Sequence, residues 1–128
     1  MYGLVKTLDD GQGGKIKLAG NALTFILYKS YFGRDLLNDI VAQLTENEQA
    51  QLLTAVGEYK FDTEFVLNFI AALMATAQYP NKPVVTDLII EIPPWWIADK
   101  AIISELMEFL SLFITDKKNK LQSNGGGL

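Results

Sequence analysis

Cysteine and histidine are both absent from this chain of 128 residues. Without cysteine the chain has no disulfide, no thiolate nucleophile and no cysteine-based zinc site, which fits a reducing compartment. Without histidine it lacks the usual general base near neutral pH and the commonest metal ligand. Positive charge is also scarce, since 11 Lys and Arg stand against 15 Asp and Glu and the sequence pI is near 4.7. We therefore expect no nucleic acid partner, because nucleic acid attracts clustered positive charge.

Long apolar runs are missing as well. The N-terminal residues contain no basic stretch followed by about 7–15 apolar residues, which is the pattern of a secretory signal. The most apolar window, residues 65–77, is about 13 residues long and holds Asn68, whereas a helix that spans a bilayer needs roughly 20. We therefore expect a cytoplasmic protein with no membrane partner.

The apolar content that is present suffices for one core. Hydrophobic residues make up 49% of the chain, and a single domain usually has about 100–150 residues. We predict a mostly α-helical fold, a compact bundle of four to five helices over residues 1–120. Residues 1–20 alternate weakly around the sequence DDGQGG, which predicts a short β-hairpin, with a loose arm as the alternative. Residues 121–128 have little apolar content and are predicted to form a flexible tail.

Two helices are predicted to meet at a corner around Gly33. Asn21 can cap the first helix, and Gly33 stands where a helix often ends with a positive φ. Asp35 is placed to cap the second helix, and its charge suits the positive end of that helix. Tyr28 and Phe32 precede the glycine at helical spacing, so we interpret them as packed residues of this structural corner.

Further helices are predicted after the corner. The second helix is expected to end near the sequence TENEQ, before a separate short helix. The longest apolar segment, residues 62–79, is hydrophobic over nearly its whole circumference, which is typical of a central helix. The next segment, residues 84–92, suits a strand or a short helix, and we favour a helix. These later helices are expected over residues 46–57, 62–79, 84–92 and, starting after Pro94 or near Asp99, up to about Lys118.

No constellation of residues predicts catalysis, a cofactor or a metal ion. The glycines of DDGQGG lack the order of a phosphate-binding loop and indicate a flexible turn. Carboxylates cluster loosely at Glu46, Glu48, Glu58, Asp62 and Glu64, and solvated helix faces are the better interpretation. Hydrolysis by carboxylates alone is a distant alternative. We therefore expect no enzymatic activity and no catalytic, cofactor-binding or metal-binding residues.

The candidates for function are apolar. Trp95 and Trp96 follow two prolines, and because adjacent side chains point in different directions, at least one indole is expected to be exposed or to meet a partner. A lid in which both cover the core is the alternative. The last helix carries two adjacent apolar stripes, of which the second is Ile103, Met107, Leu110 and Ile114, and this face is wider than the edge of a small bundle requires. We predict a protein-binding surface formed by Trp95, Trp96 and the first stripe, Ile102, Leu106, Phe109 and Phe113.

A family resemblance begins at the corner. The run YKSYFGRDLL at residues 28–37, followed by FDTEFVLNFIAALMATAQ and a C-terminal third that contains tryptophan, resembles the small tail assembly chaperones of long-tailed phages and prophages of Gram-positive bacteria. In those proteins a Y-x-x-x-F-G-[KR]-D-L stretch follows an N-terminal segment of alternating residues. The likeness covers residues 15–120.

The resemblance implies a protein that carries out no chemistry. Such chaperones bind the long, helical, aggregation-prone tape measure protein and keep it soluble. They help the tail tube protein to polymerise around it and leave before the tail is complete. We accordingly expect a homo-oligomer in the cytoplasm of a Gram-positive bacterial host that is not part of the mature virion.

Two points stay open at this stage. Many members of the family are also made in a longer form by a ribosomal frameshift, and the glycines at residues 125–127 are compatible with a slippery run of G. An ordinary loose tail or a linker is the alternative.

For the function of the protein, the alternative to a chaperone is a small acidic helical adaptor or inhibitor that occupies a basic site on a host protein.

Overall fold

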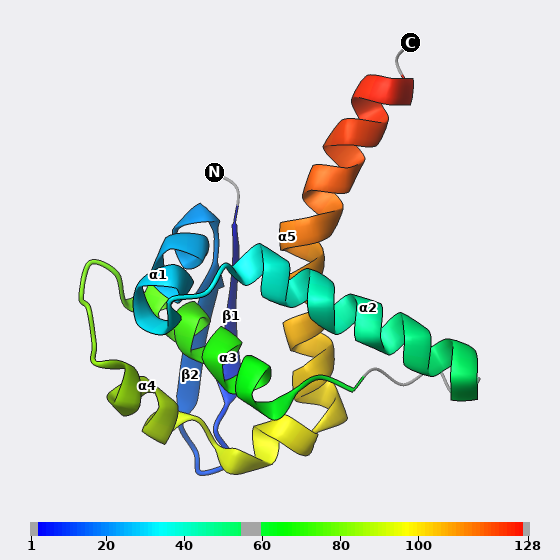
Figure 1. The fold of residues 1–128 in the computed structure, drawn as a ribbon. Coiled ribbons are helices and arrows are strands. Elements are labelled where there is room, and N and C mark those ends of the chain that lie inside the picture. Colours follow the sequence, from blue (N-terminus) through cyan, green and yellow to red (C-terminus); the bar gives the residue numbers. More distant parts are fainter. Residues whose placement is uncertain (1–2, 55–59, 127–128) are drawn as a thin grey trace.

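The computed structural model describes residues 3–54 and 60–126 of the chain (Figure 1). These residues form a mostly helical fold in which an N-terminal two-stranded antiparallel hairpin packs against the helices. The predicted fold class is therefore confirmed. The elements in chain order are β1 (Leu4–Asp9), β2 (Lys15–Gly20), α1 (Ala22–Phe32), α2 (Leu36–Thr54), α3 (Thr63–Gln78), α4 (Val85–Glu91), the 3-10 helix η1 (Pro94–Ala98) and α5 (Lys100–Gly126).

The hairpin is closed by a loop that requires glycine. Strands β1 and β2 pair antiparallel, and the last pair of the ladder is Asp9 opposite Lys15. In the loop, Gly11 and Gly13 have φ angles of 82° and 85°, which glycine adopts without a Cβ clash. The Asp10 carboxylate accepts hydrogen bonds from two N–H groups of the loop at 2.7 and 3.0 Å. The predicted hairpin is thus confirmed, and the alternative of a loose arm is wrong.

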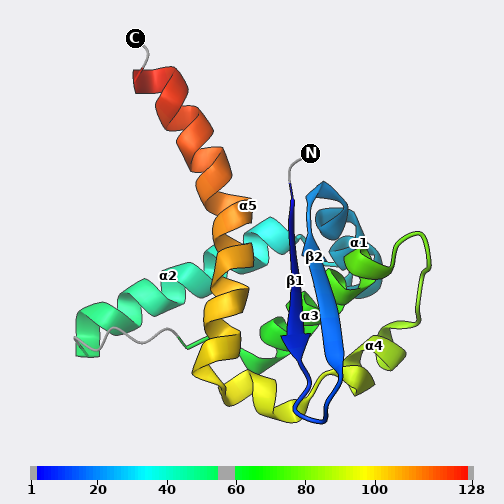
Figure 2. The ribbon, with the colours of Figure 1, turned by 180° about the vertical axis from the view of Figure 1, so that it is seen from behind.

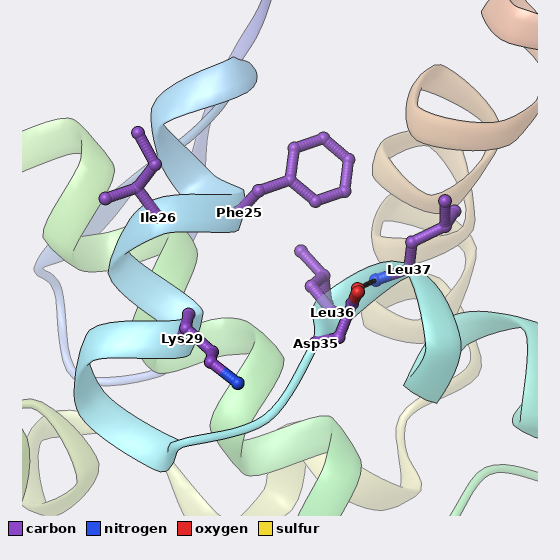
Figure 3. A pocket seen from close by; sticks show the side chains of 6 residues that line it. All are labelled: Phe25, Ile26, Lys29, Asp35, Leu36 and Leu37. Atoms are coloured by element: carbon purple, nitrogen blue, oxygen red, sulfur yellow. Dashed lines mark hydrogen bonds between the residues drawn. The ribbon is translucent and has the colours of Figure 1, made fainter.

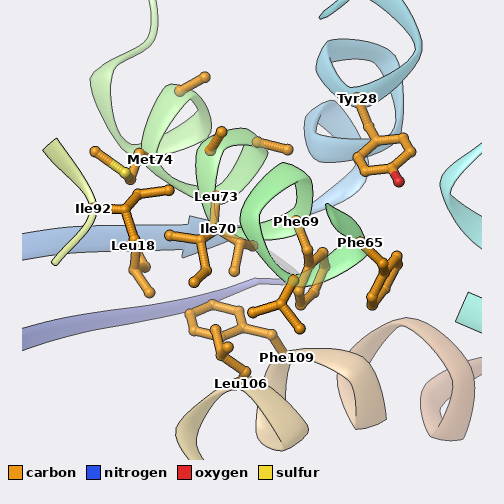
Figure 4. Close-up of a cluster of buried hydrophobic side chains, with 14 of the residues drawn as sticks. Leu18, Tyr28, Phe65, Phe69, Ile70, Leu73, Met74, Ile92, Leu106 and Phe109 are labelled. Carbon is orange, nitrogen blue, oxygen red and sulfur yellow. The ribbon is translucent and has the colours of Figure 1, made fainter. Parts of the chain in front are cut away.

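Helix α3 lies at the centre of the core, as its apolar circumference predicts. The Asp62 carboxylate accepts a hydrogen bond from the Phe65 N–H and caps the start of the helix. Every residue from Phe69 to Thr76 is buried. Helix α3 contacts β2, α1, α4 and η1, and Figure 4 shows its side chains between the hairpin, α1 and α5. The buried hydroxyl groups of Thr24, on α1, and Thr76, on α3, share a hydrogen bond of 2.9 Å, so each has a polar partner inside the core.

Helix α2 is longer than predicted. It runs without a break from Leu36 to Thr54, so the expected end at TENEQ and a separate helix over residues 46–57 are wrong. No proline or glycine interrupts this span, and the Glu, Gln, Ala and Leu residues that follow Thr45 have good helix propensity. The expected stop at Gly57 lies outside the described residues.

The C-terminal third holds two helices joined by η1. Helix α4 confirms the helix that we favour over a strand for this segment. Two prolines then end the helical path, η1 follows, and the Asp99 carboxylate accepts a hydrogen bond from the Ile102 N–H at 3.0 Å where α5 begins. Helix α5 continues to Gly126, past the predicted end near Lys118. The flexible tail over residues 121–128 stays a prediction.

Two helices reach beyond the core. The far ends of α2 and α5 project away from the hairpin and α3 in different directions (Figures 1 and 2). In the described part of the chain, no helix combines the length and the apolar composition that crossing a bilayer requires.

Candidate protein-binding surfaces

The predicted stripe on α5 is buried in the chain's own core. The exposed fractions are 6%, 4%, 0% and 8% for Ile102, Leu106, Phe109 and Phe113. Figure 4 shows Leu106 and Phe109 pointing from α5 toward α3. Strand β2 also packs closely against Phe109, because a Cβ atom on Gly20 would lie 2.8 Å from its ring. This corrects the predicted placement of the binding surface, since α3 and the hairpin already cover the stripe.

Charge also fixes the hairpin to α5. Lys6 on β1 forms ion pairs with Glu105 and Glu108, which lie one turn apart on α5. Hydrogen bonds to these two carboxylates raise the pKa of Lys6 and keep its ammonium group charged. The edge of the hairpin and the first half of α5 therefore form one unit.

The two tryptophans divide into one core residue and one surface residue. Trp96 is fully buried whereas Trp95 is 43% exposed, which confirms that one of the two indoles is exposed. Their rings meet edge to face with centroids 6.4 Å apart. Each indole N–H donates to the hairpin, from Trp95 to the Asp10 carbonyl at 3.3 Å and from Trp96 to the Asp9 carbonyl at 3.1 Å. Of the six predicted binding residues, Trp95 is the one that remains accessible.

The corner between α1 and α2 is built as predicted. Gly33 ends α1 with a φ angle of 68°, and its N–H donates to the Lys29 carbonyl at 2.8 Å. The Asp35 carboxylate caps α2 by accepting a hydrogen bond at 2.9 Å from the N–H two residues further on. Tyr28 is fully buried and its ring packs edge to face on Phe32, with centroids 5.1 Å apart.

Sequence reasoning misses Asp39, which organises this corner. Its carboxylate pairs with the Arg34 guanidinium through two hydrogen bonds of 2.7 and 2.8 Å and accepts a third, of 2.7 Å, from the Tyr28 phenol. The Arg34 hydrogen bond, supported by the phenol, holds the pKa of Asp39 below its usual range. Burial, followed by the hydrogen bond to Asp39, raises the pKa of Tyr28, so the phenol stays neutral. An acidic residue in the first turn of a helix, shortly after an arginine, is the signal that identifies such a pair.

An apolar groove opens between α1 and the start of α2, which we call the α1–α2 groove (Figure 3). Its volume is about 580 Å³, and its lining residues are Phe25, Ile26, Lys29, Asp35, Leu36 and Leu37. Ile26 is 65% exposed, because the sequence of α1 is apolar on most sides while α3 covers one side. On α2, Val41 lies one turn after Leu37 and is 49% exposed. The apolar surface therefore continues along α2 beyond the groove.

A second groove lies between the start of α3, η1 and the first turns of α5, and we call it the α3–α5 groove. Its volume is about 650 Å³. The described residues that line it are Lys60, Phe61, Thr63, Val66, Ile97, Ala98, Lys100, Ile103, Ser104 and Met107. Two of these are lysines and none is acidic, although the chain as a whole is acidic. The second apolar stripe of α5, through Ile103 and Met107, thus borders a surface groove that the first stripe does not reach.

An acidic hollow of about 280 Å³ lies beside the corner. Among its lining residues are Arg34, Asp39, Glu46, Asp62 and Glu64. Two of these carboxylates stabilise the fold, since Asp39 pairs with Arg34 and Asp62 caps α3. Glu58 lies outside the described residues. Among the side chains that the structure describes, those of residues 3–46 and 60–114, no group of three acidic residues is arranged to hold a metal ion.

Comparisons of the chain with protein-family models, with curated proteins and with solved structures find no match.

Proposed function

We propose that the protein is a tail assembly chaperone that uses the α1–α2 groove to hold a long helical partner, the tape measure protein, and that it catalyses no reaction. The observation that carries the proposal is the exposure of Ile26, at 65%, and Val41, at 49%, on two helices that meet at the corner. Large exposed apolar side chains at and beside an apolar groove mark surfaces that bind other proteins.

An amphipathic helix is the kind of partner that suits this groove. Apolar residues at every third or fourth position of such a helix would lie between α1 and α2, in the helix-in-groove mode of recognition. Full burial of a Val or Ile side chain contributes about 1.5–3 kcal/mol, so covering the exposed parts of Ile26 and Val41 contributes about 1–2 kcal/mol each. Lys29 and Asp35 border the groove with opposite charges, which favours one direction of the partner over the other.

The stretch that carries the family resemblance also shapes the groove. Within FGRDLL, Gly33 makes the turn, Arg34 pairs with Asp39, and Leu36 and Leu37 line the groove. We further propose that several copies coat the tape measure protein in the cytoplasm of a Gram-positive host. They assist polymerisation of the tail tube protein and leave before the virion is complete.

Co-expression with the tape measure protein tests this function. We expect the wild-type chain to keep the partner soluble and to elute with it as a complex. Ile26→Glu places a charge in the apolar groove and should weaken the complex at least about tenfold. The matched control is Val5→Glu, because Val5 lies on β1 away from the groove and is 60% exposed. An insoluble partner with no complex contradicts the proposed function, and an equal loss in both variants contradicts the role of the groove.

A further inference from the structure

A pocket lies between the hairpin loop, the end of α4 and the start of η1, and we call it the tryptophan pocket. Its volume is about 380 Å³, and its lining comes from residues 10–12 and 90–95. Figures 1 and 2 show the hairpin loop beside the segment that joins α4 to α5, at the opposite end of the hairpin from the N-terminus. The pocket shares no lining residue with the α1–α2 groove, so the two are separate surfaces.

The indole of Trp95 forms the aromatic part of the pocket. Its N–H donates to the Asp10 carbonyl, so the hairpin loop holds the ring in place while 43% of the residue stays exposed. Gly11 permits this close approach, because a Cβ atom there would lie 3.0 Å from the indole nitrogen. Ile90 also lines the pocket and is 78% exposed, whereas Leu88, two residues earlier, is buried and holds α4 against the core. The pocket therefore presents a fixed aromatic ring and an aliphatic side chain to a partner.

The charged side chains that line the pocket, those of Asp10 and Glu91, are both acidic. The Asp10 carboxylate is fixed by hydrogen bonds from the N–H groups of Gln12 and Gly14, at 2.7 and 3.0 Å. Among the described side chains, that of Glu91 is exposed and forms no hydrogen bond or ion pair with another. An exposed indole beside carboxylates suits a guanidinium group, which stacks on aromatic rings and pairs with carboxylates.

We propose that the tryptophan pocket binds an arginine side chain from an extended segment of a partner protein. The guanidinium group packs on the Trp95 indole and pairs with Glu91. An apolar residue two positions away points to the same side of the extended segment and contacts Ile90. A helix, which is about 10 Å across, is too wide for a pocket of this volume, whereas a single long side chain fits it. Arginine suits the pocket better than lysine, because its planar group stacks on the ring and pairs with a carboxylate through several N–H groups.

Titration with a short peptide, followed by NMR, tests this proposal. The chain contains two tryptophans, so a nitrogen–proton correlation spectrum shows two indole N–H signals, and Trp95→Phe identifies which is which. The probe is the peptide acetyl-Gly-Leu-Gly-Arg-Gly-amide. Its control carries citrulline in place of arginine, which nearly keeps the shape and removes the charge. We expect a saturable shift of the Trp95 signal with a Kd of about 1–10 mM, and binding of the citrulline peptide that is at least about fivefold weaker.

Two charge reversals locate the site. Glu91→Lys and Glu46→Lys change the net charge of the chain equally, but Glu91 lines the pocket whereas Glu46 lies on α2. We expect binding of the arginine peptide to weaken at least about tenfold in Glu91→Lys and less than about twofold in Glu46→Lys, because salt screens charges at long range. The Trp96 indole N–H, which donates to the Asp9 carbonyl, should keep its signal position in both variants and so reports on folding.

Three results would overturn the proposal. The first is the lack of a saturable shift of the Trp95 signal up to about 30 mM arginine peptide. The second is equal binding of the arginine and citrulline peptides, a comparison that needs no variant of the protein. The third is equal binding of the arginine peptide by the two lysine variants. Ile26→Glu should bind the peptide like the wild type, and because the assay contains no tape measure protein, its result is independent of the proposed function.

Discussion

Replacing Gly20 with alanine tests how tightly the hairpin closes over α5. A Cβ atom at this position would lie 2.8 Å from Cδ1 of Phe109 and 3.3 Å from Cζ of Phe113. The Phe109 ring is fully buried, so it cannot turn into solvent to make room. Forcing an extra methyl group into a packed core usually costs about 1–3 kcal/mol.

Part of this loss is offset in the unfolded state. Alanine restricts the unfolded chain more than glycine does, which contributes about 0.4–1 kcal/mol in favour of folding where the backbone is compatible. We therefore expect Gly20→Ala to lower the free energy of unfolding by about 1–2 kcal/mol, or the Tm by about 4–8 °C for a chain of this size. Thermal unfolding followed by far-UV circular dichroism measures this difference.

The same substitution in a Phe109→Val background provides the control. Valine has no atom beyond Cγ and so removes Cδ1 and Cε1, the ring atoms nearest to the new methyl group, and Gly20→Ala should cost about half as much or less in that background. A Gly20→Ala protein as stable as the wild type would refute the reasoning. It would mean that α5 moves away from β2 and that the stripe through Phe109 is open to a partner after all.

Three further predictions concern the corner and the tryptophans. Gly33→Val should lower the free energy of unfolding, measured in urea, by about 1–2 kcal/mol, because a β-branched residue fits a φ of 68° poorly. Gly33→Asn should lower it clearly less, because asparagine adopts a positive φ more readily. Equal losses of stability in the two variants would argue against the left-handed turn. Trp96→Ala should lower the free energy of unfolding by about 3–5 kcal/mol, because the side chain is buried, and Trp95→Ala should lower it by about 1 kcal/mol. Similar melting temperatures for the two variants would contradict the assignment of Trp96 to the core. The pKa of Asp39 is lower in the folded than in the unfolded chain, so its contribution to stability is complete above about pH 5 and is lost as the pH falls below about 4. Unfolding free energies measured across this range should therefore fall less steeply for Asp39→Asn than for the wild type, and parallel curves would show that the pair with Arg34 has no such effect.

Local signals in the sequence predict most of the fold. Asn21, Gly33 and Asp35 mark helix ends correctly, because capping depends on residues close in the chain. The apolar circumference of α3 identifies the central helix for a similar reason. The end of α2 is mispredicted, because the polar residues after Thr45 are compatible both with a stop and with a longer helix, and the sequence contains no glycine or proline there to decide.

The position of the apolar surface does not follow from periodicity. The stripe through Phe109 and the face that includes Ile26 both have helical spacing, but the hairpin covers the first and leaves the second exposed. Which face is covered depends on contacts between distant segments, and these have no local signature. For Asp39, the nearby Arg34 is a local signal, but the hydrogen bond from Tyr28 is not, because it requires the turn at Gly33 to bring the phenol to the carboxylate.

Site-specific photo-crosslinking tests the central claim most directly. A benzophenone side chain in place of Ile26 would stand in the α1–α2 groove, and one in place of Val5 would stand on β1 at a comparable exposure, 60% against 65%. With the tape measure protein bound, the account predicts strong crosslinks from position 26 and few from position 5. A bound partner that crosslinks from position 5 as well as from position 26, or not at all from position 26, would contradict it.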